Sequence, residues 1–232
     1  MQDIQTKAAA VTVQASASAH SLNPAGARVL RDTYRLLAAT LAFSALVAGM
    51  SAALKLPHPG LLLTLGGYFG LLFLTSHLRN SAWGLLSVFG LTGFMGYTLG
   101  PIIAAYLSMP GGSDIVTTAM GSTAVIFLAL SWYAKREDAV DMSRFGSFLM
   151  VGILTGFCLA LAAYFLQLPG LALAVSGLFV LLMSGMIMYQ IQAIVRGGED
   201  NYIMATVTLF VAIYNLFTSL LHMLGVFGGD EG

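Results

Sequence analysis

The chain has 232 residues, of which 58% are hydrophobic and only 9% are charged, and its mean hydropathy is +0.85. Soluble domains carry about one quarter charged residues, so this composition excludes an ordinary soluble protein. Apolar stretches of about 20 residues recur, which is the length a helix needs to cross the ~30 Å hydrocarbon core of a bilayer, and no alternating barrel pattern replaces them. We therefore predict an all-α polytopic membrane protein, with the lipid bilayer as its surroundings and no nucleic acid among its partners.

Seven apolar stretches follow one another, each bounded by charged residues or by Pro and Gly. The predicted spans are Thr33 to Leu54, Gly60 to Leu78, Ala82 to Leu107, Ile115 to Ala134, Phe145 to Leu166, Gly170 to Val195, and Tyr202 to Phe227. The linkers between them are mostly too short to fold alone. The function must therefore lie within the bilayer or on the segment before the first span.

That segment, residues 1–27, is rich in Ala, Ser, Thr, Val and Gln and poor in bulky apolar residues, so we expect a disordered tail. A cleaved signal peptide is the alternative, because "ASASA" follows Lys7 and resembles a small-residue cleavage site. However, "AAAVTVQ" lacks the leucine-rich core that such a peptide needs. We favour an uncleaved tail over residues 1–27 and a membrane domain over residues 28–232.

The basic residues are distributed very unequally between the two sides of the predicted membrane. Nine of the ten lie on the side of the N-terminus: Lys7, Arg28, Arg31, Arg35, Arg79, Lys135, Arg136, Arg144 and Arg196. Lys55 alone lies on the other side. Cytoplasmic loops carry the excess of Lys and Arg, so we predict an inner-membrane protein with a cytoplasmic N-terminus and a periplasmic C-terminus.

The third span contains "GFMGYTLGP", in which glycines recur at spacings of three and four and so share one helix face. The residues of this packing and kink motif are Gly93, Gly96, Tyr97, Gly100 and Pro101. Small residues let membrane helices approach closely, so this face should pack tightly on a neighbour. Pro101 should kink the helix near Tyr97 unless a polar group satisfies the carbonyl that it frees. A bend used in gating is the alternative to static packing, which we favour.

Two separated motifs carry a family resemblance. They read "TGFMGYTLGPIIAAYL" and "GGEDNYIMATVTLFVAIYNLFTSLLHMLG". The chain resembles the Bax inhibitor 1 family of seven-helix membrane proteins, and more closely its bacterial YccA-like branch, from about Val29 to Gly225. The resemblance implies a bundle whose last helix is surrounded by the other six. It also implies two activities: a pH-sensitive cation or calcium leak, in members with a buried pair of acids, and modulation of the membrane-anchored AAA protease FtsH, in YccA-like members.

The acid pair that the leak activity implies is missing from this chain. One acid of the family pattern falls at Gln190, in "YQIQ", and the other at Ala212, in "AIYNLF". Two facing carboxylates can share a proton and switch near neutral pH, whereas an amide and a methyl group do not titrate. No acidic or basic residue lies in the interior of a predicted span, apart from Arg35 near the start of the first. We therefore expect any calcium or proton leak to be weak.

A polar stripe on the last span is the remaining candidate for an ion pathway. Thr208, Asn215, Ser219 and His222 share one face with Ala212, which should point into the bundle. The stripe either lines a cavity that holds water or a weakly bound cation, or makes hydrogen bonds between helices, which we favour. His222 lies close to the outer end of the span, where a histidine is commonly interfacial.

Catalysis finds little support in the sequence. The arrangements of intramembrane serine and aspartyl proteases are absent, as are zinc-ligand spacings and phosphate-binding loops. We therefore expect no enzymatic activity, no cofactor and no bound metal. The segment "GGEDNY" reads instead as a helix stop at Gly197 followed by a new helix capped by Asp200 or Asn201.

Two functions remain at this stage. The favoured one is modulation of an FtsH-like AAA protease by direct association, in which the chain acts as a slow, competing client. An ATP-driven protease needs an unstructured end to engage, which the predicted tail would supply, and a tightly packed bundle would resist extraction. The alternative is the cation leak through the bundle.

Overall fold

The computed structural model describes residues 24–136 and 138–228, and this part of the chain is helical with no strand. Its helices are α2 (Pro24–Ala53), α3 (Leu61–Leu78), α4 (Ala82–Leu107), α5 (Gly112–Tyr133), α6 (Gly146–Phe165), α7 (Pro169–Val195) and α8 (Tyr202–Gly228), with a short 3-10 helix, η1 (Ser143–Phe145), before α6. All seven are long and apolar enough to cross a membrane. The predicted fold class is confirmed.

Helix α2 begins nine residues before the predicted first span, so residues 24–27, expected in the tail, are helical. Proline suits the first turn of a helix because its missing N–H would have no partner there. The 30 residues of α2 extend over ~45 Å, which exceeds the ~30 Å hydrocarbon core. The charged residues in its first turns can therefore lie at the membrane interface. The rest of the predicted tail, residues 1–23, lies outside the described residues.

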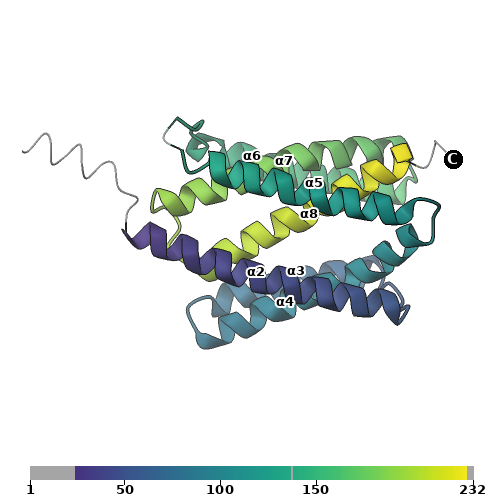
Figure 1. The fold of residues 1–232 in the computed structure, drawn as a ribbon, viewed down its shortest axis with the longest axis horizontal. Coiled ribbons are helices and arrows are strands. Elements are labelled where there is room, and N and C mark those ends of the chain that lie inside the picture. Colours follow the sequence, from purple (N-terminus) through teal and green to yellow (C-terminus); the bar gives the residue numbers. More distant parts are fainter. Residues whose placement is uncertain (1–23, 137, 229–232) are drawn as a thin grey trace, which may run out of the picture.

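Helix α8 runs between two groups of three helices, with α2, α3 and α4 on one side and α5, α6 and α7 on the other (Figure 1). It packs directly on α2, α4, α5 and α7, while α3 packs mainly on α4 and α6 mainly on α7. The central position expected for the last helix is confirmed. Its immediate neighbours are four helices rather than six, because α3 and α6 lie in an outer position.

The core forms around α8, where α4 and α7 each pack on it. Fully buried side chains there include Leu91, Ile187, Leu209 and Leu216. The outer helices expose large apolar side chains instead, such as Leu62 on α3 and Met150 on α6, as expected where lipid covers the surface. The bundle thus has a close-packed, largely apolar centre around α8 and an apolar outer surface.

Candidate functional site

The turn between α7 and α8 holds the polar segment "GGEDNY". Gly197 has a φ of 79°, the left-handed conformation that glycine adopts most easily, and Gly198 N donates to the carbonyl of Ala193 at 2.8 Å. The side-chain oxygen of Asn201 accepts a hydrogen bond from Met204 N at 3.0 Å, which is an N-cap. The predicted helix stop and the cap by Asn201 are confirmed.

Asn201 also fastens this turn to the junction of α3 and α4. Its Nδ2 donates to the carbonyl of Arg79 at 3.2 Å and to Oδ1 of Asn80 at 2.9 Å. One side chain therefore caps the central helix and ties two loops together. We name the end of the bundle that holds these loops, the start of α2 and the end of α5 the basic end.

The loop between α5 and α6 is clamped onto α7 at the same end. Gln192, only 3% exposed, donates from Nε2 to the carbonyl of Val140 at 2.8 Å and accepts from Met142 N at 2.9 Å. Arg196, one turn further along α7, forms an ion pair with Asp141 of the same loop. The sequence reading treated this loop as a plain linker and missed Gln192. The sequence feature that could have indicated it is the second glutamine of "YQIQ", two residues after Gln190, where the family pattern has an acid.

Charge interactions order the same loop. The backbone N–H of Ser143 is the main group that holds the pKa of Asp141 below its usual range, and Arg196 adds to the effect. The guanidinium of Arg136 binds Asp138 through two hydrogen bonds of 2.8 Å and lowers the pKa of that carboxyl. Both acids are solvent-exposed, so these pairs order the loop more than they stabilise the fold.

The glycine face of α4 lies against α2. A Cβ at Gly93 would lie 2.8 Å from the ring of Phe43, and one at Gly100 would lie 2.8 Å from the carbonyl oxygen of Ala48. A Cβ at Gly96 would press directly on the carbonyl oxygen of Ser44. At Gly96 and Gly100 the two helix backbones therefore approach so closely that only glycine fits, whereas at Gly93 the neighbour is a side-chain ring. Gly90 contacts α3 instead.

Pro101 lies inside α4 without ending it. Its ring leaves the carbonyl of Tyr97 without the amide donor of an ordinary helix. Ser51 on α2 donates its hydroxyl to that carbonyl at 3.0 Å. The Tyr97 hydroxyl extends to the loop after α2 and donates to the carbonyl of Pro57 at 2.9 Å. The proline site is thus satisfied by contacts with α2 and its loop.

Both positions of the family acid pair are buried. Gln190 on α7 is 5% exposed and Ala212 on α8 is 1% exposed. The Nε2 of Gln190 has no hydrogen-bond partner among the described residues. A buried donor without a partner destabilises a fold by roughly 1–3 kcal/mol, so this amide is an unusual feature of a largely apolar interior.

The polar stripe of α8 lies at the edge of the core. Ser219 is buried, whereas Thr208, Asn215 and His222 are half-buried. His222 Nδ1 lies 2.8 Å from the hydroxyl of Ser176 on α7, and Asn215 donates to the carbonyl of Val211 in its own helix. The contact of His222 joins two helices, as the favoured interpretation expects, whereas that of Asn215 stays within α8.

Two polar contacts of α8 that lie outside the polar stripe were not predicted from the sequence. Thr206 is fully buried, and its hydroxyl lies 2.7 Å from the carbonyl of Tyr202 in its own helix and 3.3 Å from the carbonyl of Thr33 on α2. The hydroxyls of Tyr214 and Thr98 on α4 lie 3.3 Å apart. Their signal was weak, because neither Thr206 nor Tyr214 belongs to the stripe. Within residues 24–136 and 138–228, no three His, Cys, Asp or Glu side chains are grouped to hold a metal ion.

Comparisons with known proteins identify a family and several relatives of this chain. Residues 26–229 match the family described as "Inhibitor of apoptosis-promoting Bax1". The chain is 53% identical over 203 residues to an uncharacterized protein of Pseudomonas aeruginosa, which covers 88% of this chain and 91% of the relative. It is 49% identical over 203 residues to "Modulator of FtsH protease YccA" of Escherichia coli, covering 88% and 92%, and equally to "Inner membrane protein YccA" of a second strain of that species.

Proposed function

Because this chain belongs to the Bax inhibitor 1 family, we propose that it is an inner-membrane protein that modulates a membrane-anchored AAA protease of the FtsH type by direct association. The observation that carries this proposal is the similarity along nearly the whole length of the FtsH modulator YccA. One relative is named a modulator and the family description names an inhibitor, and we expect no enzymatic activity in this chain.

In the proposed mechanism the protein is a slow client of the protease. Residues 1–23 supply the end that the protease engages, and α2 is the first helix that pulling would strain. A Cβ at Gly26 would lie 2.8 Å from the carbonyl oxygen of Ile194, so α2 contacts α7 from its first turn. Further along, α2 packs on α4 through Gly96. These contacts support the idea that extraction is slow, and a stalled protease would spare its other substrates.

The basic end is the proposed contact surface for the partner. Its loops are held in place by Gln192, Arg196 and Asn201, so it presents a defined surface rather than free linkers. With a cytoplasmic N-terminus, this end faces the compartment in which an FtsH-type protease unfolds its substrates. The orientation rests on the distribution of Lys and Arg.

Affinity purification of the full-length protein beside a form lacking residues 2–23 tests the proposal. This truncation keeps α2 whole, so the contact of Gly26 with α7 is retained. We expect the full chain to copurify an FtsH-type protease and its overproduction to lengthen the lifetimes of that protease's substrates. The truncated form should bind but lose the effect on lifetimes. The proposal fails if neither form captures the protease and the lifetimes do not change.

The cation leak through the bundle is the second candidate. One observation favours it, namely the buried Gln190 amide without a partner at a position where other members are expected to carry an acid. An amide has no charge to titrate, so the acid-gated flux of calcium or protons should be weak in this chain. Restoring both acids, at Gln190 and Ala212, is the direct test.

A further inference from the structure

A groove of about 420 Å³ lies between α2 and α5 at the basic end. Both helices pack on α8 but make little contact with each other, so the lipid-facing wall has a seam between them. The part of the groove further from the basic end is apolar and includes Leu37, Leu41, Phe127 and Leu128. This part therefore suits the hydrocarbon chain of a lipid.

The outer end of the groove is polar and aromatic. Tyr34 on α2 forms a hydrogen bond with the hydroxyl of Ser131 on α5, which sets the two helices at a common level. Lys135 lies with its Nζ 5.6 Å from the centre of the Tyr34 ring. Trp132 is exposed on the same wall and carries Arg136 over its ring. Tyr and Trp beside basic residues are typical of the level of lipid headgroups.

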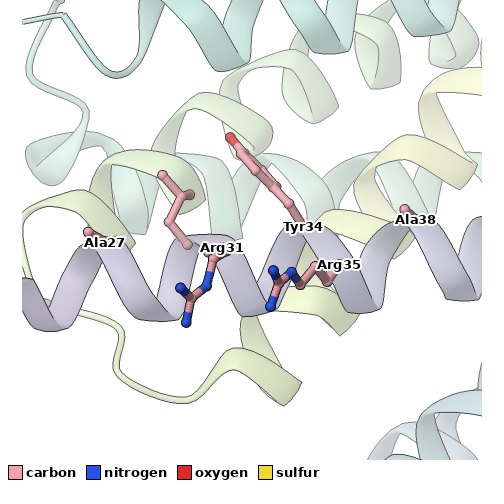
Figure 2. Close-up of a pocket in the computed structure, with 6 residues that line it drawn as sticks. Ala27, Arg31, Tyr34, Arg35 and Ala38 are labelled. Atoms are coloured by element: carbon pink, nitrogen blue, oxygen red, sulfur yellow. The ribbon is translucent and has the colours of Figure 1, made fainter.

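A second hollow of about 530 Å³ continues over α2 and shares Tyr34 and Ala38 with the groove. Arg31 and Arg35 line it, with their guanidinium groups on the same side of α2 and Tyr34 on the other (Figure 2). Their side chains are 59% and 72% exposed, and Asp32 is their common counter-ion at 3.4 and 4.0 Å. Among the described residues, Asp32 is the one carboxylate paired with these cations, so it faces two guanidinium groups and Lys135, and positive charge remains.

We propose that this groove binds one anionic phospholipid, with its phosphate beside Lys135 at the outer end and an acyl chain along Leu37, Leu41 and Phe127. Arg35, in the adjoining hollow on α2, adds to the positive charge that attracts the headgroup. The charge complementarity carries the proposal, because basic pockets between membrane helices attract anionic headgroups. A free phosphate would leave the apolar floor uncovered, and a zwitterionic lipid would bring no net charge to the cations. The site is separate from the Gln190 region and lies on the lipid-facing wall of the basic end, beside the loops of the proposed protease contact.

Trp132 supplies a local reporter of binding. The chain contains only two tryptophans, and Trp83 lies on α4. In a Trp83→Phe protein, Trp132 fluorescence reports quenching by brominated lipid at the groove. The full-length protein would be placed in vesicles of phosphatidylcholine with increasing brominated phosphatidylglycerol, and in matched vesicles with brominated phosphatidylcholine.

We expect brominated phosphatidylglycerol to quench Trp132 at several-fold lower mole fraction than brominated phosphatidylcholine. In R35Q/K135Q this preference should fall by roughly fivefold for each cation removed, since a basic side chain near anionic lipid contributes about 1 kcal/mol. R79Q/R144Q is the matched control, because it removes two exposed cations from the same end but outside the groove. Its preference should equal that of the parent.

Four results would overturn the proposal. Equal quenching by the two lipids would show that the groove does not select anionic headgroups. An equal loss in R35Q/K135Q and R79Q/R144Q would assign the preference to the overall charge of the basic end. Displacement of the lipid by sn-glycerol 3-phosphate would assign the groove to a small phosphate ligand. Absence of quenching, because another segment or a second copy covers Trp132, would also assign the groove to a different occupant.

Discussion

The hydroxyl of Ser51 on α2 donates a 3.0 Å hydrogen bond to the carbonyl of Tyr97 on α4, the acceptor that Pro101 leaves without its helical donor. This bond lies beside the contact of Gly100 with α2. The proline thus costs α4 one internal hydrogen bond, and α2 replaces it. The pairing couples a local break in helix bonding to the close approach of two helices.

The first prediction tests this coupling. Ser51→Ala should destabilise the bundle by about 1 kcal/mol, because it leaves a partly buried carbonyl without a donor. Pro101→Ala restores the amide donor within α4, so Ser51→Ala should have a much smaller effect in that background. Thermal unfolding in detergent of the four proteins of this double-mutant cycle measures the difference. Equal effects of Ser51→Ala in both backgrounds would show that the bond to Tyr97 is not what Ser51 contributes.

The region around Pro101 shows which features the sequence could predict. The spacing of Gly93, Gly96 and Gly100 follows from the helical repeat, so their shared face was visible in the sequence. The break at Pro101 was also local. The identity of the partner was not, because Ser51 lies 46 residues away and nothing in its own helix marks it as a donor to α4.

In the loops, too, local features were predictable and contacts with distant residues were not. The stop at Gly197 and the cap by Asn201 depend on neighbouring backbone groups, and both were predicted. The clamp by Gln192 joins atoms 50 and 52 residues apart, and no local pattern encodes it. The early start of α2 was missed for a related reason. Its first turns carry charged residues and pack on α7, so hydropathy alone placed the boundary too late.

The second prediction concerns the α2–α4 contact and its role in resisting extraction. Gly96→Ala would force a methyl group against the carbonyl of Ser44, so it should separate the helices and lower the unfolding temperature. Gly90→Ala is the matched control on the same helix, because its nearest neighbour is Leu71 at an ordinary 3.8 Å.

In cells, the Gly96→Ala protein should be degraded faster by the partner protease and should protect other substrates less. Pulse-chase measurement of its lifetime, with and without active protease, checks this. A Gly96→Ala protein with the lifetime of Gly90→Ala would contradict a role for this contact in slow extraction.

The third prediction concerns pH and the loop clamp. The pKa of Asp141 is lowered in the folded protein, so its contribution is present above the unfolded-state pKa and is lost as the pH falls through the folded-state value. The loop should therefore stay ordered between about pH 8 and pH 5. Hydrogen exchange of residues 138–145 measures this order.

Gln192→Leu should raise exchange at all these pH values, because it removes both hydrogen bonds of the clamp. A steep rise for the wild-type loop between pH 7 and pH 6 would contradict the assignment.

The fourth prediction concerns orientation. In a Cys158→Ser background, which removes the only cysteine, single cysteines replace Ser113 at the start of α5 or Ser143 in η1. Both positions are exposed. A membrane-impermeant maleimide should label the Ser113→Cys protein in cells with a permeable outer membrane, and the Ser143→Cys protein only after the inner membrane is opened. The reverse pattern would place the basic end outside.

The last prediction concerns the two positions where the family pattern expects acids. Gln190→Met keeps a similar side-chain length but removes the buried amide without a partner, so it should raise the free energy of unfolding by about 1 kcal/mol.

Gln190→Asp with Ala212→Asp instead places two carboxyl groups in the largely apolar interior, where burial favours their neutral forms and one proton can be shared. Calcium flux into proteoliposomes should then become pH-dependent, while the parent and the Gln190→Met protein show weak flux at every pH. Ala212→Asp alone is the control, because a single buried acid lacks the partner needed for sharing. A parent protein whose flux already rises steeply across neutral pH, and is abolished by Asn215→Leu, would show that the leak needs no acid pair and would move it ahead of protease modulation.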